Sequence, residues 1–366
     1  MSLEKLGWNK YFEKNFEPYL EKGFCAARVI NQQKGNYIVR LEKGSCNGKL
    51  SGKFLYNADL KKDYPAVGDW VAIKMINDTD AIIYAILPRK SYFARKLAIS
   101  GGRKMKNGIL VGGNIEEQII GSNIDTAFIV SGLDDNFNIG RIERYITLVR
   151  SSGATPVILL NKCDLCNNIS DYIEKIDSIA KGIAVYSISV LNNINMDIFD
   201  KFLCCNETIV FLGSSGVGKS TVINYLFGGE IQKTNAISSS NGKGRHTTTA
   251  SQLLQHSSGC TIIDTPGIRE LQLWADEDIL SESFEDIYSL TEQCRYRNCT
   301  HEKEVGCAIK AAIEDGNLTI ERFNSYKSQL NELKTLKYTR KSYDNSRVNK
   351  LNKINNVNKK RGYSEC

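Results

Sequence analysis

Residues 208–221 read TIVFLGSSGVGKST, and the segment from Gly213 to Ser220 fits the phosphate-binding pattern G-x-x-x-x-G-K-[ST]. Residues 208–212 are mostly β-branched and aromatic, which predicts a buried strand, and apolar residues recur at helical spacing after Lys219. Glycines let several backbone N–H groups point at one anion, and the positive end of the following helix adds to the attraction. An ordinary glycine-rich turn is the alternative, and it does not account for the strand and helix on either side.

The polar side chains of this loop have the chemistry to hold a nucleoside triphosphate. Lys219 would reach the β- and γ-phosphates, and the hydroxyl of Ser220 would ligate Mg²⁺. Backbone contacts to phosphate are expected along the whole loop. The predicted nucleotide-binding residues are Gly213, Ser214, Ser215, Gly216, Val217, Gly218, Lys219, Ser220 and Thr221.

A second motif, Asn161-Lys162-Cys163-Asp164, has the N-K-x-D form and follows a predicted strand over 156–160. The Asp164 carboxylate can accept two hydrogen bonds from the N1–H and exocyclic amine of guanine, whereas adenine offers no such pair. The motif therefore selects GTP over ATP. Asn161 would brace the loop, and the stem of Lys162 would lie on the base.

Two further strand ends complete the expected nucleotide site. The stretch Asp264-Thr-Pro-Gly267 follows a predicted strand over 260–263. Asp264 would hold Mg²⁺ through water, and the Gly267 amide would face the γ-phosphate. The backbone around Ser189, after a predicted strand over 183–188, is expected on the base side. We expect these loops to meet because open α/β sheets bind ligands at the carboxyl ends of their strands.

The motifs occur in a rotated order. In ordinary GTPases the phosphate loop comes first, the Asp-x-x-Gly element second and N-K-x-D third, whereas here N-K-x-D comes first. A parallel sheet tolerates such a circular permutation if the old termini lie close together and the new cut falls in a surface loop. The cut falls just after Gly267, in the segment that senses the γ-phosphate, so we expect hydrolysis to move the module that follows.

This combination resembles the circularly permuted, small-ribosomal-subunit-dependent GTPases of bacterial ribosome maturation. The resemblance covers most of the chain. Besides the motifs above, it rests on VGDWV at 67–71, NIDTAFIV at 123–130, GRHTTT at 244–249, DTPGIRE at 264–270 and a cysteine–histidine cluster at 294–307. It implies GTP hydrolysis stimulated by the small subunit, with GTP, GDP and Mg²⁺ as ligands, contact with ribosomal RNA and a role in late maturation of that subunit.

The stretch at 244–249 is similar to the first switch of a GTPase, in which Thr248 or a neighbouring threonine would complete the Mg²⁺ shell. Ile268 stands where many GTPases carry the glutamine that orients the attacking water, so intrinsic turnover should be slow. His246 is the candidate for positioning that water, and the alternative is that it packs or contacts RNA. The predicted catalytic residues are His246, Thr248, Asp264 and Gly267.

Cys294, Cys299, His301 and Cys307 place three thiols and one imidazole within fourteen positions. This set has the ligand types and count of a closed tetrahedral zinc site. Four protein ligands leave no open position, so we expect one structural Zn²⁺ that staples a helical module too short to build its own core. The alternative is four residues that bind no metal.

Five strand-like runs precede the nucleotide motifs, over 24–30, 37–41, 49–55, 69–75 and 81–87. They predict a small β-barrel of the OB type, which often binds oligonucleotides, and a purely structural barrel is the alternative. Residues 97–121 are polar and glycine-rich with a basic cluster alongside, which indicates a linker or an RNA-contacting loop.

The composition is that of an ordinary globular protein. The chain has 366 residues, 42% of them hydrophobic and 24% charged, with a formal net charge of +7. Its eleven cysteines show no disulfide framework, and we find no signal peptide and no apolar run of about 18 residues. We therefore expect a cytoplasmic monomer without a membrane partner. The strongly basic stretch 334–361 suits RNA phosphates, and a disordered solubilising tail is the alternative.

The predicted fold is multidomain α/β. It comprises an N-terminal extension over 1–22, an OB-type barrel over 23–96, a circularly permuted P-loop GTPase domain over 97–275 and a zinc-bound helical module with the basic tail over 276–366. The predicted function is that of a GTPase that binds the small ribosomal subunit and acts in its late maturation. The alternatives are a permuted GTPase serving another RNA partner and a non-catalytic RNA-binding module gated by GTP.

Overall fold

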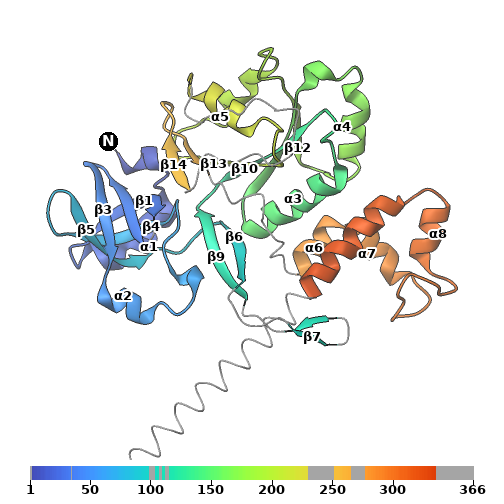
Figure 1. Ribbon diagram of the computed structural model, residues 1–366, viewed down its shortest axis with the longest axis horizontal. Helices are drawn as coiled ribbons and strands as arrows, with labels where there is room; N and C mark the ends of the chain where they lie inside the picture. The colour runs from blue at the N-terminus through green and yellow to red at the C-terminus, as the bar shows by residue number, and fades with distance from the viewer. Residues whose placement is uncertain are drawn as a thin grey trace, which may run out of the picture.

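The computed structural model describes residues 2–33, 35–98, 104–106, 109–111, 115–229, 251–264 and 277–334. The predictions for His246, Thr248, Gly267 and Ile268 lie outside the described residues, as does the basic tail beyond residue 334. Figure 1 shows a barrel at the N-terminal end, a central sheet flanked by helices, and a helical module beside α3. None of the described helices is long and apolar enough to cross a membrane.

Five strands form the N-terminal barrel. They run in the order β1-β2-β3-β5-β4, and β4 pairs back with β1 to close the barrel. β3 and β5 are parallel, whereas the other neighbours are antiparallel. Inward-facing side chains such as Val29, Val39 and Ile73 are fully buried. The predicted OB-type barrel is confirmed, with strands β1 (Cys25–Gln33), β2 (Asn36–Leu41), β3 (Gly44–Leu50), β4 (Trp70–Met75) and β5 (Asp80–Ile86).

The third strand lies earlier than the sequence indicated, so the prediction of a strand over 49–55 is wrong. β3 ends at Leu50, and α2 (Gly52–Asn57) follows at once. The hydroxyl of Ser51 accepts a hydrogen bond from the Phe54 N–H at 3.0 Å and caps this helix. The local cap outweighs the strand propensity of the apolar residues that follow it.

The N-terminal extension packs against the outer face of the barrel wall. It contains a 3₁₀ turn, η1 (Leu3–Leu6), and the helix α1 (Lys10–Leu20), which Asn9 caps through the Tyr11 N–H at 3.1 Å. Phe12 and Phe16 are buried against Trp70 of β4. The extension therefore forms a second apolar cluster with the outward-facing side chains of the barrel, separate from the barrel core.

A two-stranded hairpin leads from the barrel to the central sheet. β6 (Tyr92–Ala98) pairs antiparallel with β9 (Ile115–Ser122), and a short hairpin of β7 (Lys104–Lys106) and β8 (Ile109–Val111) lies between them in the chain. The prediction of a linker over 97–121 is therefore wrong for the residues that form these strands.

The central sheet is mostly parallel, as the alternating pattern predicted. Its order is β12-β11-β10-β13-β15-β14; the first five strands are parallel and β14 is antiparallel to β15. β13 is buried on both faces, because Val210 and Leu212 face one apolar cluster while Ile209 and Phe211 face another. The strands are β10 (Thr126–Gly132), β11 (Thr155–Asn161), β12 (Ala184–Ser187), β13 (Thr208–Leu212), β14 (Gln252–Gln255) and β15 (Thr261–Asp264).

The helices that connect these strands are short. α3 and α4 border the apolar cluster that contains Val210, and α5 borders the cluster that contains Phe211. Residues 196–201 form a 3₁₀ turn. The elements are α3 (Ile139–Ser152), η3 (Cys163–Leu165), α4 (Ile169–Asp177), η4 (Met196–Lys201) and α5 (Lys219–Leu226).

The C-terminal helical module shares its core with the central unit. It consists of α6 (Glu277–Ser283), α7 (Glu285–Glu292), α8 (Ala308–Glu314) and a helix over 320–334. Leu280, Phe284 and Ile287 are buried in the same apolar cluster as Ile142 and Ile146 of α3. A module too small for a separate core thus completes one on the α3 surface.

The barrel meets the central sheet at a buried arginine. Arg28 of β1 is 1% exposed, and its Nη2 donates to Thr208 Oγ1 at 2.9 Å and to the Asn123 carbonyl at 3.2 Å. Its Nε donates to the Gly68 carbonyl at 3.1 Å, and its Nη1 donates to the Leu6 carbonyl and to Thr261 Oγ1. Burial lowers the pKa of Arg28 to about 10, which still leaves it protonated at neutral pH.

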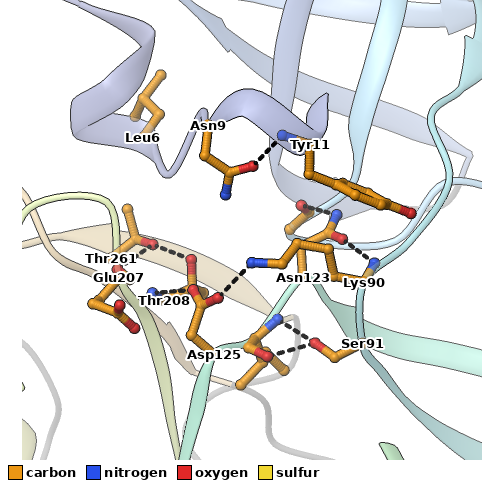
Figure 2. A network of polar contacts seen from close by, with 12 residues as sticks. Leu6, Asn9, Tyr11, Lys90, Ser91, Asn123, Asp125, Glu207, Thr208 and Thr261 are labelled. Carbon is orange, nitrogen blue, oxygen red and sulfur yellow. Dashed lines mark hydrogen bonds and ion pairs between the residues drawn. The ribbon is translucent and has the colours of Figure 1, made fainter. Parts of the chain in front are cut away.

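Figure 2 shows the polar groups gathered at this junction. Asp125 accepts the Thr208 N–H at 2.9 Å and the Lys90 ammonium at 2.9 Å, and Thr261 donates to Thr208. Thr208 and Thr261 are the first residues of β13 and β15. The barrel therefore contacts the amino ends of β13 and β15, two of the strands whose carboxyl ends carry nucleotide motifs.

Candidate nucleotide and metal sites

The predicted nucleotide loops leave one edge of the sheet. Asn161 is the last residue of β11, Gly213 follows the end of β13, and Asp264 is the last residue of β15. These strands are parallel members of one sheet, so their carboxyl ends lie on the same side. The geometry brings together motifs that are about 100 residues apart in the chain.

The phosphate loop has a backbone that only glycine adopts easily. Gly213, Gly216 and Gly218 have φ values of 144°, 79° and 98°. A Cβ at Gly213 would lie 2.3 Å from the Val130 carbonyl oxygen, whereas a Cβ at Gly216 would meet nothing within 4 Å. The loop thus packs closely against β10 at Gly213 and is exposed to solvent at Gly216.

The side chains of the phosphate loop lie where the pattern predicted. Lys219 opens α5, and its ammonium donates to the carbonyls of Gly213 at 2.8 Å and Ser214 at 2.6 Å. Ser220 follows in the first turn and is half-buried with Thr221, while Ser215 is exposed and Val217 is buried. The Lys219 side chain therefore lies back over the loop that would surround a phosphate chain.

The loop that selects guanine is tied to the phosphate loop. The Asn161 side-chain amide donates to the Val217 carbonyl at 2.9 Å, which is the bracing contact expected for this residue. A Cβ at Gly218 would lie 2.2 Å from Asn161 Nδ2, so the close approach depends on glycine there. One hydrogen bond thus fixes the relative position of the two motifs.

The remaining residues of the N-K-x-D loop differ in exposure. Cys163 is buried, and its N–H donates to the Ile188 carbonyl at 3.1 Å. Asp164 is exposed at the edge of the sheet, as a carboxylate that reads a base must be. Lys162 has a φ of 64°, and its ammonium pairs with Asp134 at 2.5 Å. Sequence reasoning missed Asp134; the signal was an acidic residue two positions after the end of β10.

The backbone around Ser189 forms a closed turn beside this loop. The Ser189 N–H donates to the Ile194 carbonyl at 3.1 Å, the Ile194 N–H returns a bond at 2.9 Å, and the Ser189 hydroxyl accepts from the Asn192 N–H at 3.2 Å. Ser189 is buried. Its own polar groups are used inside the turn, so its effect on a bound base would come through the shape of the turn.

Only some of the residues predicted to lie around magnesium are among the described residues. Asp264 is half-buried at the end of β15, the strand next to the one that carries the phosphate loop. Its expected partners Thr248 and Gly267, and the water-positioning candidate His246, lie outside the described residues.

The predicted metal ligands form a compact cluster. The ligand atoms of Cys294, Cys299, His301 and Cys307 all lie within 4.8 Å of one another. The Cys294 and Cys307 sulfurs are 4.0 Å apart, and His301 Nδ1 lies 3.6 Å and 3.5 Å from them. Zinc–sulfur bonds of about 2.3 Å in a tetrahedron put sulfurs about 3.8 Å apart, so the spacing fits. Burial lowers the pKa of His301, which favours the neutral imidazole that binds metal.

Comparison with known proteins places this architecture in a family. The family model described as "RsgA GTPase" matches residues 87–274. "Small ribosomal subunit biogenesis GTPase RsgA 2" of Lactiplantibacillus plantarum is 37% identical over 313 residues, which cover 86% of this chain and 84% of that protein. The chain belongs to the RsgA GTPase family. "Small ribosomal subunit biogenesis GTPase RsgA" of Opitutus terrae is also 37% identical, over 89% of this chain and 88% of its own length.

A second family model, described as "50S ribosome-binding GTPase", matches residues 208–341 and so begins at the phosphate-loop strand. The crystal structure of YjeQ from Thermotoga maritima superposes with a TM-score of 0.58 at 21% identity, covering 85% of this chain and 98% of that chain. The structure of YloQ, described as a circularly permuted GTPase, gives 0.56 at 24% identity, covering 85% and 95%. The RsgA fold, with its rotated motif order, is therefore the fold of this chain.

Proposed function

We propose that this chain is a GTPase that binds the small ribosomal subunit, hydrolyses GTP to GDP and phosphate when the subunit stimulates it, and acts in late maturation of that subunit. The family membership and the names of the relatives support this proposal. The observation that carries the nucleotide part is the hydrogen bond from Asn161 to the Val217 carbonyl, because it joins a guanine-reading loop to a phosphate-binding loop.

In this proposal each loop holds one part of the nucleotide. Asp164 accepts the two guanine donors, the Lys162 stem covers the base, and the turn at Ser189 with Cys163 shapes the rim. The backbone N–H groups of 213–221 surround the phosphates, and Lys219 exchanges its carbonyl partners for the β- and γ-phosphates. The exchange costs little because the ammonium is already directed at the loop.

Magnesium would be held by Ser220, by Asp264 through water and by Thr248. When bound, it neutralises charge that builds on the phosphates during transfer. The Gly267 amide would face the γ-phosphate, and His246 would orient the attacking water. Ile268 has no polar group for that task, so turnover should be slow until the subunit arranges the site.

The cysteine–histidine cluster would hold one structural Zn²⁺, since its spacing fits a tetrahedral ion. We further propose that the barrel, the zinc module and the basic tail contact ribosomal RNA, and that the protein works as a cytoplasmic monomer. The division at residues 22, 96 and 275 remains our proposal for the domains, although β6 crosses the boundary after 96 and pairs with β9 beyond it.

One experiment tests the central claim. GTP hydrolysis would be measured with the protein alone, with purified small subunits and with purified large subunits, and each mixture would be pelleted with GDP or a non-hydrolysable GTP analogue. We expect acceleration and triphosphate-dependent pelleting with small subunits only. Acceleration by large subunits alone would support another RNA partner and would remove the stated function.

The second candidate is a non-catalytic RNA-binding module gated by GTP, favoured by the lack of a polar side chain at Ile268. It predicts triphosphate-dependent pelleting without any turnover, even in the presence of small subunits. Phosphate release in the same mixtures would exclude it.

A further inference from the structure

An ion pair outside the nucleotide motifs holds the lysine of the N-K-x-D loop. The Lys162 ammonium lies 2.5 Å from Asp134 Oδ2, and the two side chains are 18% and 22% exposed. Asp134 stands in the turn between β10 and α3, two residues after the end of β10. β10 and β11 are parallel neighbours, so the turn after β10 and the loop after β11 leave the sheet side by side.

The Asp134 carboxylate is fixed from several directions. Its Oδ1 accepts the Asn136 N–H at 3.0 Å, and its backbone carbonyl accepts the Phe137 N–H at 2.9 Å. A Cβ at Gly132 would lie 2.7 Å from Oδ1, so the absence of a side chain there leaves room for the carboxylate. These hydrogen bonds and the one from Lys162 outweigh the effect of burial and hold the pKa of Asp134 below its usual value.

The same turn is also tied to the motif through the backbone. The Leu133 N–H donates at 2.9 Å to the backbone carbonyl of Asn161, the residue whose side chain bonds the phosphate loop. Lys162 is therefore held at both ends: its backbone by the neighbouring Asn161 and its ammonium by Asp134. A side chain with four rotatable bonds is ordered before any ligand arrives.

This arrangement affects the carboxylate that reads the base. Asp164 is exposed and lies two positions after Lys162, so a released lysine ammonium would be free to pair with it. Pairing would cover the oxygens that guanine needs, and a freely rotating lysine would have to be ordered again when the base binds. Asp134 prevents both by holding the ammonium in the ion pair.

We propose that Asp134 is a positioning residue that acts through Lys162 to prepare the guanine-binding loop. The inference rests on the proposed guanine site and adds a residue from a different strand to it. It concerns affinity for the base, not the transfer of phosphate.

The test compares Asp134→Asn with Asp135→Asn. Both replacements remove one negative charge, but Asp135 is exposed and adjacent to the pair. Dissociation constants for GDP and for ADP would be measured with Mg²⁺ present. We expect Asp134→Asn to weaken GDP binding about fivefold, the size expected when one long side chain must be ordered on binding. Asp135→Asn should match the unchanged protein, and Asp134→Glu should recover part of the loss.

A double replacement separates positioning from a general structural role. If Asp134 acts through Lys162, then Asp134→Asn combined with Lys162→Met should bind GDP no more weakly than Lys162→Met alone. Multiplied losses in the double variant, or equal affinities for the Asp134 and Asp135 variants, would overturn the inference. Failure of the unchanged protein to prefer GDP over ADP would instead overturn the proposed function.

Discussion

The central unit holds its two neighbours by different kinds of contact. The barrel is joined through buried polar atoms around Arg28, whose partners are carbonyl and hydroxyl oxygens from five segments. The helical module is joined through apolar side chains on α3, with the Arg322–Glu143 and Arg144–Glu332 ion pairs beside them. Hydrogen bonds lose strength steeply when donor and acceptor shift, whereas apolar burial is non-directional.

This difference indicates which of the two units, the barrel or the helical module, can move relative to the central sheet. A shift of the barrel would break several buried hydrogen bonds together, so we infer that barrel and sheet move as one body. The helical module can slide on α3 and keep most of its buried area. It also follows the Asp264–Gly267 segment in the chain, so the expectation that hydrolysis moves this module agrees with the softer contact.

Zinc removal should have the largest effect on stability. The effect should be confined to the helical module. Structural zinc contributes about 10–16 kcal/mol in zinc-finger peptides, so chelation should unfold the helical module while the barrel junction survives. Limited proteolysis after chelation should cut within 277–334 first. Earlier cleavage between barrel and sheet would mean that the polar junction is the weaker one.

Arg28→Met should give the next largest effect. The replacement removes one donor each from the buried oxygens of Gly68, Asn123 and Thr208, which should lower the free energy of unfolding by about 3–5 kcal/mol. Chemical denaturation measures the loss, with Arg141→Met at an exposed position of α3 as the control. A loss no larger than that of the control would show that the junction does not depend on this guanidinium.

Arg322→Met should cost less, about 2–3 kcal/mol, because the apolar part of the α3 contact remains. Lys327→Met removes an exposed ion pair of the same module and should be nearly neutral.

The loss in Arg322→Met should depend on pH. Burial raises the pKa of Glu143 above its ordinary value of 4.5, and Arg322 opposes that rise. A carboxyl group with a raised folded pKa contributes stability that is full below the unfolded pKa and is lost as pH rises through the folded pKa. The deficit of the variant should therefore shrink as pH falls toward 4.5. A deficit that is constant across this window would place the cost elsewhere.

Asp164→Asn should have the smallest effect on stability, within about 0.5 kcal/mol, because the side chain is exposed and distant from both contacts. It should nevertheless change nucleotide choice from GTP toward xanthosine triphosphate, whose altered base edge suits an amide. Competition binding with the two triphosphates measures the change. An unchanged preference for GTP would remove the guanine assignment.

Most of the site followed from local sequence because each motif carries its own reason. The spacing from Gly213 to Ser220 needs only a strand before it and a helix after it, and both are present. The motif predicted that Asn161 braces its loop, and the structure adds its contact with Val217 of the phosphate loop. Asp134 was not found, because one acidic residue after a strand has no pattern of its own until β10 lies beside β11.

The errors in the fold have a similar cause. Residues 49–55 look like a strand by propensity, but Ser51 caps a helix whose position depends on the closure of the barrel. Residues 97–121 look like a linker by composition, but their flanks pair as β6 and β9. Local propensity is a weak prior, and pairing between distant segments overrides it.

The sequence by itself indicated the nucleotide-binding motifs, their rotated order and the four candidate metal ligands, because these depend on residue type and short spacing. Only the tertiary structure decided that Arg28 joins the barrel to β13 and β15, that Asp134 holds Lys162, and that the helical module completes its core on α3. Those contacts join residues far apart in the chain. Their energies come from burial and hydrogen-bond geometry, which exist only once the strands and helices are assembled.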